Sequence, residues 1–111
     1  MNDRTRTARR TIAQRSATAR AAARIRRSTV VTLSTYATAA GLHDRDARSM
    51  AGSLRSVAKR LAVTGTAGST FRKGQRRDCQ RYTITELRII AAAYKPRRQE
   101  FRTARTYLLA I

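Results

Sequence analysis

The strongest hydrophobic pattern in the chain lies between residues 44 and 61. Apolar side chains recur there at intervals of three and four positions, namely Ala47, Met50, Ala51, Leu54, Val57, Ala58 and Leu61. Such intervals put them on one face of an amphipathic helix. Half of the positions between them are cationic and the others are Ser or Gly, and Asp44 precedes the run as the expected N-cap. The pattern predicts a helix with one buried face and one exposed, basic face.

A shorter helix is predicted just ahead of it. The apolar residues Leu33, Tyr36, Ala37 and Ala40 fall on one helical stripe. Gly41 follows directly, and glycine readily adopts the positive φ that commonly ends a helix. The pattern therefore predicts two helices joined by a short turn.

The helical periodicity is lost after residue 61. Residues 62–66 form a short β-compatible run. Segments 70–73 and 80–84 then flank Gly74 and a basic stretch. Two β-compatible segments around a glycine-containing turn predict a hairpin, here with a charged tip.

Two further helices are predicted towards the C-terminus. Thr83 and Glu86 form a Thr-x-x-Glu capping box, which marks the start of the first. Pro96 ends it, because proline lacks an amide hydrogen and disfavours helix at the residue before it. The apolar positions of the two helices are Leu87, Ile90, Ala91 and Tyr94, then Phe101, Ala104, Leu108 and Ile111. The expected fold class is mainly α with a small β-hairpin.

The aromatic residues mostly fall on these apolar stripes, so core packing is their expected role. They are Tyr36, Phe71, Tyr82, Tyr94, Phe101 and Tyr107. The apolar stripe of the C-terminal helices exceeds what so small a core needs. Its members are Leu87, Ile90, Tyr94, Phe101 and Leu108. This surplus favours a homodimer formed through the C-terminal helices.

Residues 1–28 differ from the rest of the chain. They carry nine arginines against Asp3, and their only large apolar side chains beyond Met1 are Ile12 and Ile25. We expect a basic N-terminal arm, flexible or helical, followed by one domain over residues 29–111. The Arg-rich, acid-poor bias is shared with organelle transit peptides, but no secretory signal or membrane span is expected.

The whole chain is strongly cationic. It has 25 Lys and Arg against 6 Asp and Glu in 111 residues, a formal charge of +19. Like charges repel and destabilise a compact fold, so a polyanionic partner is expected. Only three cations are lysines; the preference for arginine suits phosphate and guanine recognition, although a GC-rich genome would also produce it.

The segment from Leu33 to Gly52 resembles the helix-turn-helix family of DNA-binding domains. Ala37 stands at that family's small fifth position and Gly41 at its turn. The hydrophobic positions of the motif hold Tyr36, Ala40, Leu42, Ala47 and Met50. Over residues 30–94 the order of elements is similar to the winged helix-turn-helix, in which a basic hairpin follows the recognition helix.

The resemblance implies double-stranded DNA as the partner and assigns contacts to three regions. On the recognition helix these are Arg45, Arg48, Ser49, Arg55 and Lys59, with Arg45 and Arg48 reading bases. In the wing they are Arg72, Lys73, Arg76, Arg77 and Arg81. In the arm they are Arg24, Arg26 and Arg27. Asp78 is expected to pair with Arg76 or Arg81, and His43 to reach a phosphate from the turn.

Catalysis and metal binding are not expected. With one histidine and one cysteine, His43 and Cys79, the chain offers no zinc-ligand spacing. It also has no paired carboxylates and no phosphate-cradling glycine loop, so neither an enzyme nor a cofactor site is predicted. Cys79 is expected to be an ordinary strand residue.

These patterns predict a transcriptional regulator or DNA-architecture factor of a mobile element, plasmid or phage. It would act in the cytoplasm at the nucleoid. Two other classes of protein would have a similar positive charge. One is an RNA-binding or ribosome-associated structural protein, and the other is a basic effector that binds an acidic protein.

Overall fold

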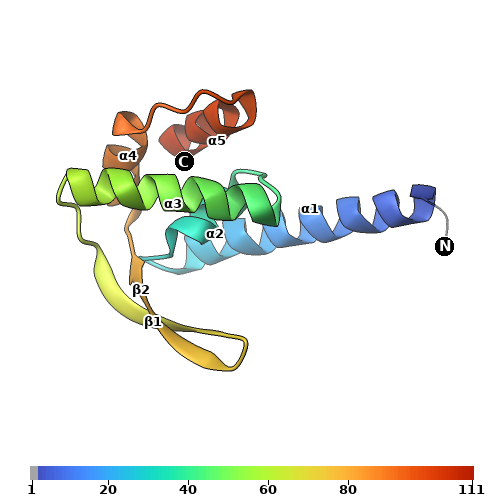
Figure 1. Ribbon diagram of the computed structural model, residues 1–111, viewed down its shortest axis with the longest axis horizontal. Coiled ribbons are helices and arrows are strands. Elements are labelled where there is room, and N and C mark those ends of the chain that lie inside the picture. The colour runs from blue at the N-terminus through green and yellow to red at the C-terminus, as the bar shows by residue number, and fades with distance from the viewer. Residues whose placement is uncertain (1–2) are drawn as a thin grey trace.

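The computed structural model describes residues 3–111, apart from the side chains of Thr70 and Arg72. Within that range the chain is mainly helical, with one two-stranded antiparallel sheet, as predicted (Figure 1). The elements are α1 (Asp3–Arg27), α2 (Leu33–Ala39), α3 (Asp44–Arg60), β1 (Thr66–Arg72), β2 (Gln75–Arg81), α4 (Ile84–Ala93) and α5 (Gln99–Ala110).

The predicted helix pair α2–α3 is confirmed. Tyr36 and Ala37 of α2 are buried against α3, and Gly41 takes a φ of +97° in the turn between the helices. The expectation that Asp44 caps α3 is wrong by one position. His43 is the N-cap and makes no side-chain capping bond, while Asp44 lies in the first turn and complements the helix dipole there.

The apolar face of α3 lies in the core as its periodicity predicts. Ala47, Met50, Ala51, Leu54, Val57 and Ala58 are all buried. Leu61 is the exception, because the helix has ended there and its side chain is 40% exposed. Ala62 then adopts a φ of +58°, and Val63 N–H donates to the Ala58 carbonyl at 2.9 Å. This is the Schellman arrangement, which satisfies the last helix carbonyls.

The hairpin forms, but with longer strands than expected. Thr66 pairs with Arg81 at its base and Arg72 with Gln75 at its tip. The turn is Lys73–Gly74, with φ of 52° and 75°, as a type I′ hairpin turn requires. No separate strand covers 62–66 in the described chain; only Thr66 of that run is in β1. The basic residues thus lie in β2 rather than in a loop.

Tyr82 fixes the hairpin to the helical body. It forms an isolated antiparallel bridge with Val31, and its carbonyl accepts the Tyr36 hydroxyl at 2.8 Å. Gly65, with a φ of +67°, lies so close that a Cβ there would come within 2.9 Å of the Tyr82 ring. Burial raises the pKa of Tyr36 to about 12, and the Glu86 carboxylate acts in the same direction. The bonds and close packing at Tyr82 set the direction in which the hairpin leaves the core.

The C-terminal helices form as predicted. Thr83 and Glu86 exchange both capping-box bonds, at 3.0 and 3.1 Å. Arg105 of α5 donates to the carbonyls of Ala91 and Ala92 at the end of α4, so it joins the two helices.

The five apolar residues from which a homodimer was expected do not form a free surface. All five residues invoked for it are buried within the single chain: Leu87, Ile90, Tyr94, Phe101 and Leu108. They fill the space between α3, α4 and α5, so the structure gives no support to a dimer through these helices. Most aromatics are buried as expected, but Phe71 is 77% and Tyr107 is 37% exposed.

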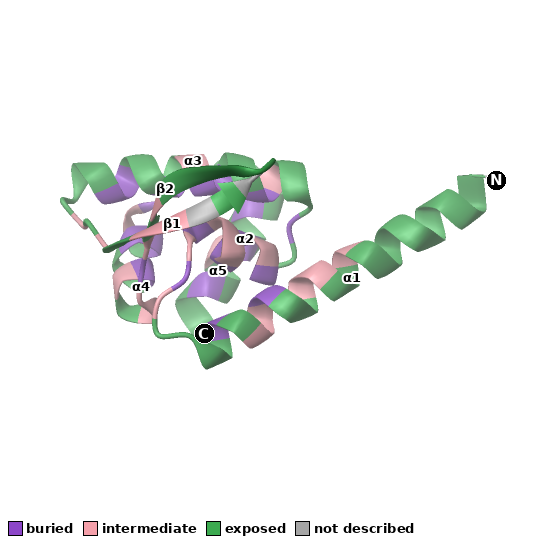
Figure 2. Cartoon of the chain, turned by 90° about the horizontal axis from the view of Figure 1, so that it is seen from below, coloured by how far each residue is buried: buried purple, intermediate pink, exposed green. Residues whose placement is uncertain are grey.

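The N-terminal segment is helical, and its two halves differ. Ala21 and Ile25 are buried against the body, and Gln14 donates to the Leu42 carbonyl at 2.8 Å. Residues 3–13 are exposed throughout and project beyond the α2–α3 turn (Figures 1 and 2). The arm expected over residues 1–28 is therefore docked over its second half.

Candidate nucleic-acid interface

The outward face of α3 holds the cations predicted for the recognition helix. The four cations Arg45, Arg48, Arg55 and Lys59 are all exposed, and so is Ser49. Their position follows from the opposite face, because Met50, Ala51 and Leu54 have no exposed surface and fix the rotation of the helix. The outward face is thus held in one orientation by the core.

Both acids at the start of α3 are paired. Asp44 contacts Arg48 at 3.3 Å, and Asp46 contacts Arg98 at 3.6 Å. Arg98 also contacts Glu100 at 3.4 Å and stacks over the Phe101 ring, which ties the start of α5 to α3. The Asp44–Arg48 pair is solvent-exposed, and such pairs contribute little stability. Arg48 can therefore exchange Asp44 for another acceptor at small cost.

Arg55 connects the α3 face with the base of the hairpin. Burial raises the pKa of Tyr82, the Glu86 carboxylate raises it further, and the Arg55 guanidinium opposes them. Arg55 is therefore near enough to Tyr82 to act on it electrostatically. The hairpin itself reaches the same upper edge of the molecule as α3 in Figure 2.

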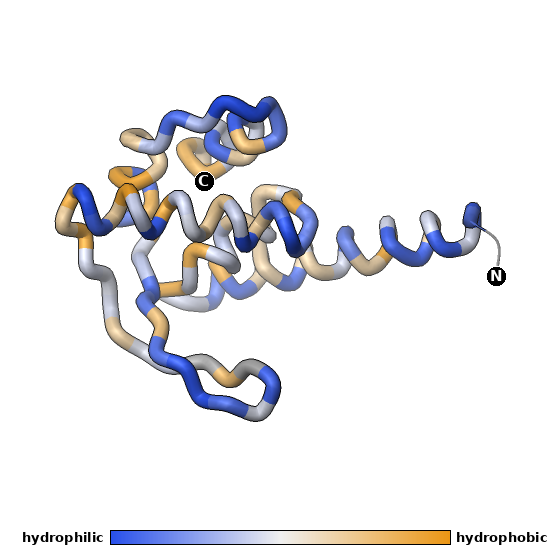
Figure 3. Tube along the Cα trace, viewed as in Figure 1, coloured by the Kyte–Doolittle hydropathy of each residue, from blue (hydrophilic) through white to orange (hydrophobic). Residues whose placement is uncertain are grey.

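The cations of the hairpin are divided between its two faces. Alternate residues of a strand point to opposite sides, so Arg77 and Arg81 share one face and Arg76 takes the other. Lys73 stands in the turn. The Arg72 side chain lies outside the described residues. Figure 3 shows the hydrophilic run along β2. A single basic tip, as expected from the sequence, is replaced by a two-sided basic ribbon.

The ion pair expected for Asp78 is not found among the described side chains. Asp78 faces Ser69 across the ladder, and the Arg81 guanidinium donates to the Ser69 carbonyl at 3.3 Å instead. Arg81 therefore supports the hairpin besides adding charge to it.

Phe71 is a candidate contact residue that the sequence does not reveal. It stands in β1 opposite Arg76, close to the turn, with 77% of its surface exposed. An aromatic side chain among cations on a free-standing ribbon is well suited to stack on a base. No periodicity marks it, because aromatics in strands are usually core residues.

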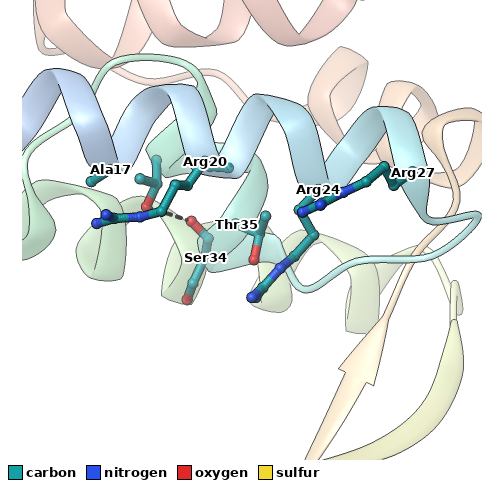
Figure 4. A pocket seen from close by; sticks show the side chains of 8 residues that line it. Ala17, Arg20, Arg24, Arg27, Ser34 and Thr35 are labelled. Carbon is teal, nitrogen blue, oxygen red and sulfur yellow. Dashed lines mark hydrogen bonds between the residues drawn. The ribbon is translucent and has the colours of Figure 1, made fainter.

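The three arginines predicted in the arm lie on different sides of α1. Arg24 and Arg27 line a groove between α1 and α2, whereas Arg26 is absent from its lining and turns to another side of α1. The groove has a volume of about 330 Å³. Arg20 and Arg24 approach it from α1, and Ser34 and Thr35 from α2 (Figure 4).

Comparisons with protein-family models, with curated proteins and with solved structures gave no match. The site is therefore interpreted from its own chemistry.

That chemistry consists of guanidinium groups, hydroxyls and one exposed aromatic. Guanidinium and hydroxyl groups are donors that bind phosphate oxygens. Among residues 3–111, no group of three or more His, Cys, Asp or Glu is arranged to hold a metal ion. Within the same range, every helix is too short or too polar to cross a bilayer. His43 is exposed at the α2–α3 turn, and Cys79 is a half-buried strand residue.

Proposed function

We propose that this protein is a non-enzymatic, winged helix-turn-helix protein that binds double-stranded DNA. α3 would enter the major groove, and the hairpin would follow the adjacent backbone or minor groove. The observation that carries the proposal is the rigid placement of an exposed cationic helix face beside a free-standing basic hairpin. The order of elements also supports it: a helix, a bridge residue at Val31, the α2–α3 pair, and then a hairpin whose exit pairs with that bridge.

The roles of the side chains follow from their positions. Arg45 and Arg48 stand in the first turns of α3, where side chains of a recognition helix reach base edges. Arg55 and Lys59 stand later on the same face and would bind phosphates. The hairpin cations would bind the backbone on either side of the ribbon. Such a protein would act at the nucleoid as a regulator or architecture factor of a plasmid, phage or other mobile element.

The test compares one base-reading residue with one backbone-binding residue. A preferred duplex is first selected from random DNA. Arg48→Ala should then cost about 1–3 kcal/mol on that duplex and flatten the preference at one base pair. Arg76→Ala should weaken binding to all duplexes alike and lower the dependence of log affinity on log salt by about one unit. Base edges differ between sequences, whereas phosphates do not.

Arg102→Ala is the matched control. Arg102 is exposed on α5, which lies on the other side of the body from the hairpin (Figure 1). Like the two test substitutions, Arg102→Ala removes one positive charge, but it does so outside the proposed interface. If Arg48→Ala and Arg76→Ala weaken binding equally on every sequence, α3 does not read bases and the helix-turn-helix interpretation fails.

RNA binding is a second candidate, and one observation favours it. The exposed Phe71 ring would stack well on an unpaired base of an RNA loop. Competition between duplex DNA and a structured RNA separates the two functions. Preferential displacement by RNA, together with a larger loss for Phe71→Ala than for Arg48→Ala, would replace the DNA proposal.

A further inference from the structure

One stripe of α1 carries five arginines in two groups, with Ala13, Ser16 and Ala17 between the groups. Arg20, Arg24 and Arg27 follow at intervals of four and three residues. Arg9 lies eleven residues before Arg20, which is about three helical turns, so it shares their face, and Arg6 lies one turn earlier. From Arg6 to Arg27 the stripe is about 32 Å long at 1.5 Å per residue.

The second half of this stripe forms a wall of the α1–α2 groove. Arg20, Arg24 and Arg27 line one side, and the hydroxyl residues Ser34, Thr35 and Thr38 line the other (Figure 4). A neighbouring cavity of about 370 Å³ shares Arg24 and Thr35 and extends to Arg81 at the base of the hairpin. All the residues that line the two cavities are neutral or cationic.

The arrangement is electrostatically unfavourable in the free protein. Like charges at i, i+3 and i, i+4 destabilise a helix. Among the described residues, no carboxylate forms an ion pair with Arg20, Arg24 or Arg27. Aligned guanidinium groups facing hydroxyl donors form a track of hydrogen-bond donors, and a row of phosphates is the ligand that supplies matching acceptors.

We propose that the α1 stripe and the α1–α2 groove bind the backbone of a second duplex DNA segment. This inference rests on the proposed function, in which α3 binds the first. The groove is separated from the α3 face because α2 lies between α1 and α3, and it borders the first surface only at Arg81 (Figure 2). The buried face of α3 points towards α2, so its cations point away from the groove.

The dimensions agree with a duplex ligand. The stripe of about 32 Å is close to one turn of B-DNA, which measures about 34–36 Å. One molecule that holds DNA on α3 and again along α1 bridges two segments. Bridging by a single chain requires no dimer.

The experiment captures one duplex on another. Biotinylated duplex on beads is incubated with the full-length protein and a second, fluorescent duplex, and the captured fluorescence is measured. The groove variant is Arg20→Gln, Arg24→Gln and Arg27→Gln combined. The matched control is Arg4→Gln, Arg15→Gln and Arg26→Gln combined. These three arginines are also exposed, eleven residues apart, on the other side of α1.

We expect the groove variant to bind the first duplex as the control variant does and to lose most of the captured second duplex. The salt slope for capture should fall by about 2.7, or 0.9 for each of three phosphate contacts. Equal capture by the two variants would overturn the inference. Wild-type protein that binds one duplex but captures no second one would overturn it too and leave the proposed function standing. Wild-type protein that binds no duplex at all would reject both.

Discussion

The two long helices α1 and α3 both carry rows of cations, but the protein holds them in different ways. Six side chains of α3 are buried, including Met50 and Leu54, and they contact helices on two sides. α1 is held by two buried side chains, Ala21 and Ile25, and by the Gln14 bond to the α2–α3 turn. The same type of charge is thus presented from a helix packed along its whole length in one case and from a helix docked only over its second half in the other.

This difference matches what each surface is proposed to bind. Reading a base edge needs a guanidinium held in a narrow range of position and angle, which the packing of α3 supplies. Binding a phosphate tolerates movement, because the backbone offers similar acceptors along its length. On the proposed function, the packing of each helix therefore distinguishes the surface that would read bases from the surface that would bind phosphates, and charge alone does not.

The largest effect should come from weakening the packing of α3. Leu54 is fully buried under α3, so Leu54→Ala should lower the free energy of unfolding by about 2–5 kcal/mol. Chemical denaturation followed by far-UV circular dichroism measures it. A loss below about 1 kcal/mol would mean that α3 is not held by this core.

The corresponding change in α1 should be smaller and local. Ile25→Ala should cost about 1–2 kcal/mol, because its side chain lies at the margin of the core. Amide hydrogen exchange should accelerate through α1 and stay unchanged in α3. Faster exchange in both helices would show that they unfold as one unit. The proposed difference between the anchoring of α1 and that of α3 would then be wrong.

High pH should weaken the unit that contains α3. Because the folded protein holds the pKa of Tyr36 at about 12, above its ordinary value of 10.0, the fold favours the neutral phenol. The contribution of Tyr36 to the free energy of unfolding is therefore fully present below pH 10. It is lost as the pH rises from 10 towards 12. Tyr36→Phe should reduce this dependence, and Tyr82 and Tyr94, whose pKa values burial also raises, should account for what remains. The substitution should also cost about 0.5–1.5 kcal/mol at neutral pH by losing the bond to the Tyr82 carbonyl. Equal pH profiles for the two proteins would contradict the assignment.

The smallest effect should come from exchanging glycine and alanine in the two helices, which changes only their helix propensity. Gly52 lies on α3 with open space where a Cβ would stand, so Gly52→Ala should stabilise the fold by up to about 1 kcal/mol. Ala13→Gly reverses that change in the projecting half of α1 and should leave the melting temperature nearly unchanged, since residues 3–13 are fully exposed. Thermal melting measures both. If Gly52→Ala also weakens DNA binding, the open space at Gly52 is used by the ligand.

Most helices could be predicted from the sequence because their signals are local. The α3 periodicity and the Thr83–Glu86 capping box each lie within a few residues, and both correspond to what is observed. The strands extend further than predicted. Arg76 and Arg77 are exposed and carry no alternation of hydrophobicity, and the register is set by the Lys73–Gly74 turn.

The remaining features depend on contacts between distant segments. Ala21 and Ile25 dock on the body although their surroundings are typical of a basic arm. A single isoleucine among small alanines gives almost no periodic signal. The groove that brings Arg24 opposite Thr35 exists only once α1 has docked on α2. The burial of Leu108 likewise depends on how α5 folds back, so a surplus that suggested a dimer is used within one chain.

The two-stranded sheet leaves both of its outer edges without a neighbouring strand in the described structure. Open edges are templates on which further strands can add and start fibril growth. In this hairpin the exposed arginines of β2 make two copies repel each other, and the exposed Phe71 would attract them. Colloidal stability should therefore depend on ionic strength. Concentrated salt, which screens the arginines but not the aromatic ring, removes the barrier to self-assembly.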